Sequence, residues 1–310
     1  MSSETLTLSV RPRGKPVKKL PEESSITLNA SGAELYGQLA RQAGFSVHRL
    51  RITKGSDGSL VPYSKDVSIS QTGLRDQSTI YVKDLGPQLG WRTVYVVEYL
   101  GPLLIHPIIY LLRPYIYTNP SYISFPAPSQ LQTLSLILIT AHFAKRELET
   151  IFVHRFSLAT MPFFNIFKNS FHYWVLAGLN VAFWIYRPGS PTSKPTNALL
   201  LYPALVLYLV GELGNFYTHI TLRRLRTSGG KERGIPHGAG FDLVTCPNYM
   251  FETLAWVAIW MVTGSWSTLF FVVLGVGQMG AWAKKKEGKY RKEFGDRYKK
   301  KRFCMLPGVW

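Results

Sequence analysis

Three short stretches of this 310-residue chain place polar side chains inside or beside long apolar runs. In "DLVTCPNYMFETLAW" (242–256), Asn248 and Glu252 are four residues apart and would share one face of a helix that starts at Pro247. Tyr249 lies beside them and carries a hydroxyl group that could donate a proton in catalysis. Because unpaired polar groups are costly to bury in an apolar phase, this stretch indicates either a chain boundary or a ligand site.

A second stretch, "GELGNFYTHITLRRLR" (211–226), forms a polar stripe. Asn215, His219, Arg223 and Arg226 follow one another at helical spacings, so they would lie on one helix face. Arginine binds phosphate with a planar fork of donors, which suits a ligand with a polar head and phosphate groups. Anchoring at a membrane surface would explain the arginines, but it would not explain Asn215.

The third stretch is "AHFAKRELETIF" (141–152), in which His142, Lys145, Arg146 and Glu149 also fall on one helix face. The simpler interpretation is a rim of cationic side chains that extend to the membrane surface, with a solvated glutamate. The alternative is a further part of the same ligand site.

Glu98 is isolated within the apolar run "YVVEYLGPLLIHP", and a carboxylate inside a membrane segment is a functional-site hypothesis by default. Cys246 has no evident His or Asp partner, so we interpret it as a small buried residue and not as a nucleophile. It and Cys304 are the two cysteines of the chain, too few for a disulfide framework. No metal site is predicted.

The elements that must position these residues fall into two parts. Residues 1–86 predict a small α+β domain with strands and one helix in the order strand, strand, helix, strand, strand, strand, which resembles the β-grasp fold of ubiquitin. Ser31 and Glu34 form the pattern of a capping box, and Gly44 would end the helix. The predicted strands are 5–10, 24–30, 48–54, 60–64 and 78–85.

From Trp91 onward the chain alternates between apolar segments and breaks that are basic or rich in proline, as in a multi-span, all-α membrane domain. Basic residues follow the second, fourth and sixth segments, which places the N-terminal domain and the C-terminal tail together in the cytosol. The predicted spans lie near 91–112, 131–151, 171–186, 198–220, 250–262 and 266–282.

The formal net charge is +18, and a basic tail (Ala283–Arg302) contributes much of it. Such charge attracts nucleic acid, anionic lipid or phosphate-bearing ligands. We exclude nucleic acid as a partner because the chain has several apolar segments of membrane length, so membrane lipid and anionic ligands remain.

The combination of "AHFAKRELETIFVHRFS", "GNFYTHITLRRLR", "GIPHGAGFDLVTCPNYMFETLAW" and "YRKEFGDRYKKKRFCMLPGVW" resembles the steroid 5α-reductase superfamily. Within it, the chain is most similar to the very-long-chain trans-2-enoyl-CoA reductases, which join an N-terminal ubiquitin-like domain to a membrane reductase domain, here residues 87–310. The resemblance implies NADPH as the hydride donor. It also implies reduction of a very-long-chain trans-2-enoyl-CoA, the last step of the fatty-acid elongation cycle, in the endoplasmic reticulum membrane beside other elongation enzymes.

The resemblance also implies roles for single residues. Glu98 matches the carboxylate that engages the substrate carbonyl, and it could donate a hydrogen bond only in its protonated form. The steroid enzymes have a tyrosine where this chain has Phe143, so we expect Tyr249 to be the proton donor, with Lys145 favouring its ionised form or binding phosphate. The positions that match cofactor contacts are Arg146, Asn215, Arg223, Arg226, Asn248, Glu252 and Tyr290, together with His219, which replaces an acidic residue of the steroid enzymes.

Three other functions remain open from the sequence. A membrane methyltransferase of the isoprenylcysteine type would use S-adenosylmethionine, but that family has Arg-His-Pro before its tyrosine, whereas this chain has Cys246, Pro247 and Asn248 before Tyr249. A reductase of another enone lipid would share the cofactor site. A non-catalytic scaffold would have no need for Glu98 in an apolar run.

Overall fold

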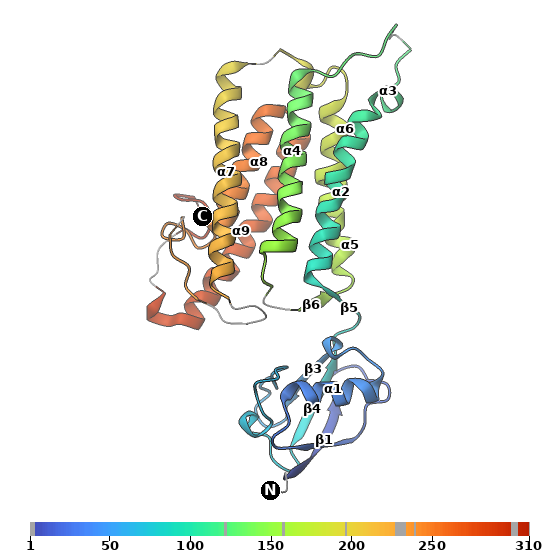
Figure 1. The fold of residues 1–310 in the computed structure, drawn as a ribbon, viewed down its shortest axis with the longest axis vertical. Helices are drawn as coiled ribbons and strands as arrows, with labels where there is room; N and C mark the ends of the chain where they lie inside the picture. The colour runs from blue at the N-terminus through green and yellow to red at the C-terminus, as the bar shows by residue number, and fades with distance from the viewer. Residues whose placement is uncertain are drawn as a thin grey trace. The chain divides into compact units, whose positions relative to one another are not determined.

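The computed structural model describes residues 4–120, 123–156, 159–195, 197–226, 234–238, 240–298 and 303–309. The chain divides into two compact units (Figure 1). The sheet unit comprises Met1–Gly90 and Ala159–Asn165, and the helical unit comprises Trp91–Leu158 and Ile166–Trp310. Residues 299–302 of the predicted basic tail lie outside the described residues.

The sheet unit is built on a four-stranded mixed sheet in the order β2-β1-β4-β3. β1 (Thr5–Pro12) pairs antiparallel with β2 (Glu23–Thr27) and parallel with β4 (Thr79–Asp84). β4 also pairs antiparallel with β3 (Leu50–Lys54). Every second residue of β1 is buried from Leu6 to Val10, as expected for a strand that covers an apolar core with one face.

The helix α1 (Gly32–Ala43) begins and ends as the sequence predicts. The Ser31 side chain accepts a hydrogen bond from the Glu34 backbone, and the Glu34 carboxylate accepts one from the Ser31 N–H at 2.9 Å. Gly44 ends the helix with a φ of 69°, a left-handed conformation that favours glycine. The predicted capping box is therefore confirmed.

The predicted strand at 60–64 is wrong. Leu60 forms only an isolated bridge with Thr53, and the Val61 N–H donates to the Ile52 carbonyl at 3.0 Å. Pro62 follows and has no N–H group, so it cannot continue the ladder. The unit has instead a short antiparallel pair between β5 (Gln88–Gly90) and β6 (Thr160–Pro162), and two helical turns, η1 (Val47–Arg49) and η2 (Ser70–Thr72).

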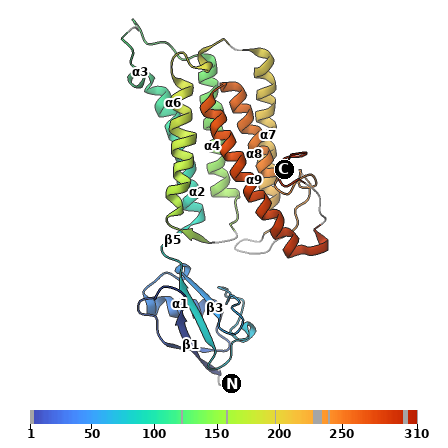
Figure 2. The same ribbon diagram turned by 180° about the vertical axis from the view of Figure 1, so that it is seen from behind.

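The described remainder of the chain is mainly helical, and the long helices lie side by side in both ribbon views (Figures 1 and 2). Helical segments occupy all six apolar ranges expected from the sequence. They are α2 (Trp91–Leu111), α3 (Arg113–Ile116), α4 (Gln130–Leu148), η3 (Glu149–Val153), α5 (Asn165–Ser170), η4 (Phe171–Asn180), α6 (Val181–Tyr186), η5 (Pro191–Ser193), α7 (Ala198–Arg224), α8 (Pro247–Thr263), α9 (Trp266–Phe294) and η6 (Gly295–Arg297).

Within the described residues, three helical stretches are long and apolar enough to cross a membrane. They are Trp91–Leu111, Ala198–Arg224 and Trp266–Arg297. The chain is thus a mixed helix-and-strand protein with a membrane part, and the other three expected spans stay predictions.

Two glycines allow α7 to lie close against α8. A Cβ atom at Gly211 would lie 2.6 Å from the Ala255 backbone nitrogen, and one at Gly214 would lie 2.4 Å from the Phe251 ring. Both distances are too short for real contacts, so glycine is required at these points. The close approach brings the polar residues of α7 within hydrogen-bond reach of those on α8.

Candidate active site

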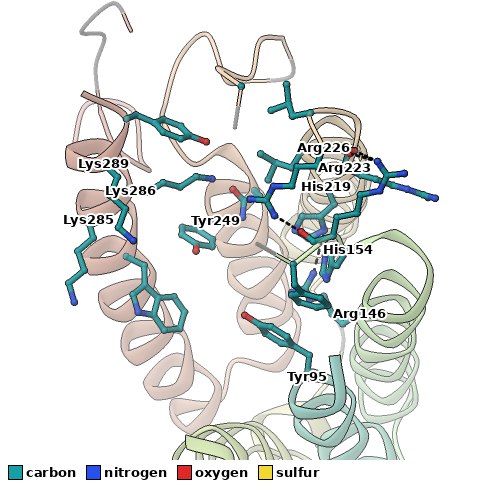
Figure 3. Close-up of a pocket in the computed structure, with 18 residues that line it drawn as sticks. Tyr95, Arg146, His154, His219, Arg223, Arg226, Tyr249, Lys285, Lys286 and Lys289 are labelled. Atoms are coloured by element: carbon teal, nitrogen blue, oxygen red, sulfur yellow. Dashed lines mark hydrogen bonds between the residues drawn. The ribbon is translucent and has the colours of Figure 1, made fainter. Parts of the chain in front are cut away.

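A cavity of about 490 Å³ lies in the helical unit (Figure 3). Its walls come from α2, α4, α7, α8, α9 and the segment after η3. Of the residues singled out from the sequence, those that line it are Arg146, His219, Arg223, Arg226, Asn248, Tyr249 and Tyr290.

One wall of the cavity is formed by arginines at the end of α7 and after η3. Arg155 donates through Nη1 to the carbonyl oxygens of Arg223, at 3.3 Å, and of Arg226. Arg226 in turn donates to the Arg155 carbonyl. These bonds join two segments that are about 70 residues apart in sequence and hold their guanidinium groups in one region (Figure 3).

The opposite wall is the C-terminal part of α9, which contributes Lys285, Lys286 and Lys289 to the cavity lining (Figure 3). The Nζ atom of Lys286 lies 5.5 Å from the centre of the Tyr290 ring, a distance at which a cation is attracted to an aromatic face. Among the described lining residues there is no aspartate or glutamate. The cavity is therefore strongly cationic and suits a ligand with several phosphate groups.

Behind the cavity, α4, α7 and α8 share a buried network of charged side chains. His142 lies between two carboxylates, with Nδ1 2.6 Å from Glu212 Oε1 and Nε2 3.3 Å from Glu252 Oε1. Lys145 Nζ lies 2.7 Å from Glu212 Oε2 and donates to Asn215 Oδ1 at 2.9 Å. Each carboxylate thus has a basic partner, as buried charges require.

Asn215 connects this network to the first turn of α8. Its Nδ2 donates to the Asn248 carbonyl oxygen at 2.9 Å and to Glu252 Oε2 at 3.0 Å. The side-chain oxygen Oδ1 of Asn248 is buried, and it has no hydrogen-bond partner among the described residues. Nε of Arg146 also has no hydrogen-bond partner among the described residues, but it lies 4.0 Å from Glu252 Oε1, within the distance of an ion pair. Both residues line the cavity, and Asn248 Oδ1 is available to a ligand.

Arg146 is held in place by groups from α2 and η3. It donates through Nη2 to the Tyr99 hydroxyl at 2.7 Å and through Nη1 to Glu149 Oε2 at 2.8 Å. The same oxygen of Glu149 lies 3.1 Å from Nδ1 of His219. The guanidinium is therefore fixed in position, and its Nε atom lies 4.0 Å from the Glu252 carboxylate.

A π-helical turn brings His154 to this cluster. The His154 N–H closes the turn by donating to the Glu149 carbonyl at 2.8 Å, and the His154 and His219 rings meet edge to face at 4.7 Å. Burial, together with the positive charge of Arg146, lowers the pKa of His154 to about 2. His154 is therefore a neutral imidazole on a cationic wall, and π turns of this kind occur frequently at functional sites.

Glu149, His154 and His219 place one donor atom each within 4.8 Å of one another, a spacing that could hold a metal ion. However, Arg146 already bonds to the Glu149 carboxylate and lies 3.4 Å from Nδ1 of His219. A divalent ion would lie beside this fixed positive charge, which is unfavourable. We assign Glu149 to balancing the charge of Arg146.

Two tyrosines on the cavity wall could take part in proton transfer. The ring of Tyr249 lies 6.4 Å from that of Trp282, and within the described part of the chain its hydroxyl has no hydrogen-bond partner. Tyr95 stacks between Tyr99 and Phe156, at 5.8 and 5.6 Å. Phe143, which the resemblance predicts to stand in place of a tyrosine of the steroid enzymes, is fully buried and does not line the cavity.

The other residues proposed from the sequence lie outside the cavity lining. Lys145, Asn215 and Glu252 form the network behind it. Glu98 is buried on α2 and accepts a hydrogen bond from Asn169 Nδ2 at 2.6 Å. No hydrogen bond joins Lys145 to Tyr249 among the residues that the structure describes. The expected effect of Lys145 on the ionisation of Tyr249 is therefore not supported by a direct contact.

Several lining residues were not identified from the sequence. Tyr95 precedes Tyr99 by one helical turn, and the three lysines of α9 were visible only as part of a long basic tail. A helical plot of α9 would have placed the lysines on neighbouring faces, but not opposite the arginines of α7. The missed residues are Tyr95, His154, Arg155, Trp282, Lys285, Lys286 and Lys289.

Several known proteins have sequences similar to this chain. Residues 159–310, which include α7, α8 and α9, match the family model for 3-oxo-5-alpha-steroid 4-dehydrogenase. A Schizosaccharomyces pombe protein named as an enoyl reductase is 41% identical over 97% of this chain and 99% of its own length. The very-long-chain enoyl-CoA reductase of Dictyostelium discoideum is 38% identical over 94% of this chain and 95% of its own length. This chain belongs to the enoyl-CoA reductase family.

The family extends to more distant members. The trans-2,3-enoyl-CoA reductase-like protein of Mus musculus is 30% identical over 79% of this chain and 69% of its own length.

Proposed function

We propose that this protein reduces the 2,3 double bond of very-long-chain trans-2-enoyl-CoA with NADPH as the hydride donor. The observation that carries the proposal is the cavity, which combines seven arginine and lysine side chains with two tyrosines from α2 and α8. Membership of the enoyl-CoA reductase family supports the reaction class. The substrate and the cofactor both carry several phosphate groups, which the cationic walls would bind.

The residues present fit a nicotinamide nucleotide. Asn248 Oδ1 is a buried polar atom without a hydrogen-bond partner among the described residues, and the N–H of a carboxamide would satisfy it. Arg223, Arg226 and the α9 lysines would hold the phosphates, and Tyr290 lies beside them on the same wall. When bound, NADPH supplies a hydride to the β-carbon of the enoyl group.

The protein's own groups must manage the charge and the proton. Reduction at the β-carbon develops negative charge on the thioester oxygen, and donors or cations near that oxygen stabilise it. We assign proton donation at the α-carbon to the Tyr249 hydroxyl, whose phenolate would then recover a proton from solvent. Glu98, held by Asn169, is the proposed group for orienting the thioester carbonyl, to which it would donate a hydrogen bond in its protonated form.

Lys145, Asn215 and Glu252 act in this proposal as positioning residues. They hold the first turn of α8, which carries both Asn248 and Tyr249. His219 fixes the carboxylate that orients Arg146.

The location of the protein belongs to the same proposal. We place it in the endoplasmic reticulum membrane with the N-terminal domain and the C-terminal tail in the cytosol, where the other elongation enzymes would supply its substrate. Three apolar helices and the cationic charge beside them support a membrane position. The parallel central pair β1 and β4 and the single long helix α1 support a ubiquitin-like β-grasp for residues 1–86.

The test is NADPH oxidation by the detergent-purified protein with a long-chain trans-2-enoyl-CoA. The Tyr249→Phe variant should lower kcat by about 100- to 10,000-fold, the range expected for loss of a general acid. Tyr95→Phe is the matched control, since Tyr95 lines the same cavity, and it should change kcat far less.

The other outcomes assign the function differently. Loss of turnover in Tyr95→Phe but not in Tyr249→Phe would identify Tyr95 on α2 as the proton donor. NADPH binding without turnover would indicate another enone lipid as substrate. Binding of S-adenosylmethionine in place of NADPH would favour the methyltransferase, and binding of neither would favour the scaffold.

A further inference from the structure

The solvent-facing side of the sheet unit carries a compact group of cations around a small cavity. The cavity has a volume of about 170 Å³ and is lined by Arg13, Arg51, Thr53 and Lys83. Arg51 and Lys83 come from the neighbouring strands β3 and β4, and Arg13 follows β1. All three cationic side chains are exposed, while Thr53 is buried at the base.

The strand register places like charges against each other. Arg51 and Lys83 are direct partners in the antiparallel pair β3–β4, an arrangement that is destabilising unless an anion lies between them. Arg13 adds a third cation to the pair. Its Nη1 donates to Thr53 Oγ1 at 3.2 Å, and this bond holds the guanidinium beside β3. The fold thus maintains a repulsive cluster that stability alone would not favour.

The acidic residues nearest in sequence do not neutralise this cluster. Asp84 forms a two-fold hydrogen bond with Arg49, at 2.5 and 3.0 Å, and Asp57 lies 3.2 Å from Lys54. Within the described ranges, none of the three cluster cations takes part in a salt bridge. The face therefore has an uncompensated positive charge.

The kind of anion follows from the donors and from the position of the unit in the chain. Two arginine forks, one ammonium group and a nearby hydroxyl suit a phosphate group, which offers several oxygens in different directions. The first segment of the sheet unit ends at Gly90, and Trp91 is the first residue of a helix long and apolar enough to cross a membrane. The unit is thus tethered at a bilayer surface, where anionic lipids are the most concentrated phosphates.

We propose that this face, formed by Arg13, Arg51 and Lys83, binds the phosphate-monoester headgroups of anionic membrane lipids. The inference does not depend on the reaction proposed for the helical unit. It gives the sheet unit a function of its own, which is to bind the surface of an anionic membrane.

The test uses the full-length protein in nanodiscs of neutral phosphatidylcholine. These are mixed with phosphatidylcholine vesicles that contain phosphatidylinositol 4-phosphate, or phosphatidylserine at matched surface charge, and vesicle retention is measured. The wild type should retain the phosphoinositide vesicles preferentially. The double variant Arg51→Ala/Lys83→Ala should weaken this retention by about 30-fold, since each cation near an anionic surface contributes to binding.

The matched control is Lys65→Ala/Arg75→Ala, which removes the same charge from exposed positions between β3 and β4. It should retain the vesicles as the wild type does, and enoyl-CoA turnover should be unchanged in both double variants. Arg13→Lys/Arg51→Lys keeps the charge but removes the planar forks, and it should weaken retention of phosphoinositide vesicles only.

Three results would overturn the proposal. The first is equal retention of both anionic vesicles by the wild type, and the second is undiminished retention by Arg51→Ala/Lys83→Ala. The third is binding of a poly-glutamate peptide without retention of either vesicle, which would assign the face to an acidic protein partner.

Discussion

The sheet unit and the helical unit distribute polar and apolar residues in opposite ways. In the sheet unit, leucine, isoleucine and valine side chains fill the centre, and the charged residues face solvent. In the helical unit, large apolar side chains are exposed, with Leu199 at 85% and Leu213 at 67%, while His142, Glu212 and Glu149 are buried. The difference is what a unit in water and a unit in lipid would require.

This contrast changes how each unit is stabilised. Removing apolar surface from water is the main driving force for the sheet unit. Apolar helices gain little of this inside a bilayer, because lipid tails are as apolar as leucine, so close packing and polar contacts must hold them together. Gly211 against Ala255, and the bonds of Asn215 to α8, are such contacts. The buried polar groups of the helical unit therefore serve both its assembly and its site.

The largest effect that would sharpen this contrast is expected from the centre of the helical unit. Glu212→Gln removes the charge that pairs with His142 and Lys145, and breaking a buried ion pair by removing one partner costs about 3–5 kcal/mol. The free energy of unfolding in mixed micelles would measure this loss. Leu213→Ala, at an exposed neighbouring position, is the control and should change stability by less than about 0.5 kcal/mol. Equal effects would mean that the charges are not central to the fold.

A somewhat smaller effect is expected in the sheet unit. Leu39 is fully buried on α1, so Leu39→Ala should destabilise this unit by about 2–4 kcal/mol through lost burial and a new cavity. Hydrogen exchange of the strands would detect the change. Leu60→Ala, at a half-exposed position, should leave exchange nearly unaltered. An effect of Leu39→Ala on exchange in α7 and α8 would show that the two units unfold together.

The smallest effect concerns an ion pair on the surface of the sheet unit. The hydrogen bonds from Arg49 lower the pKa of the Asp84 carboxyl below its ordinary value of 3.8. Because the folded-state pKa is depressed, the pair stabilises the fold above that ordinary value, and the stabilisation is lost as pH falls through the folded-state pKa. Asp84→Asn should therefore cost at most about 1 kcal/mol at neutral pH and nothing in strong acid.

Unfolding measured between neutral and acidic pH would check this sign. Arg49→Met should remove the same pH-dependent component, and the double variant Arg49→Met/Asp84→Asn should add nothing further if the pair acts as a unit. A larger loss for Asp84→Asn at low pH than at neutral pH would contradict the assignment.

Local features were predictable from the sequence because they depend on neighbouring residues. The capping box of Ser31 and Glu34, the left-handed end at Gly44 and the helical ranges follow from short patterns. The strand expected at 60–64 failed because Pro62 stops the ladder, a consequence that the alternating pattern did not reveal.

The sequence by itself also determined which polar residues share a helix face, such as Asn215 and His219, since the 3.6-residue period depends only on position. It could not determine their partners. Lys145 meets Glu212 from 67 residues away, and the lysines of α9 face the arginines of α7 across the cavity. Only the tertiary structure decided these contacts, because they depend on how closely the helices pack and on the turn that follows α4.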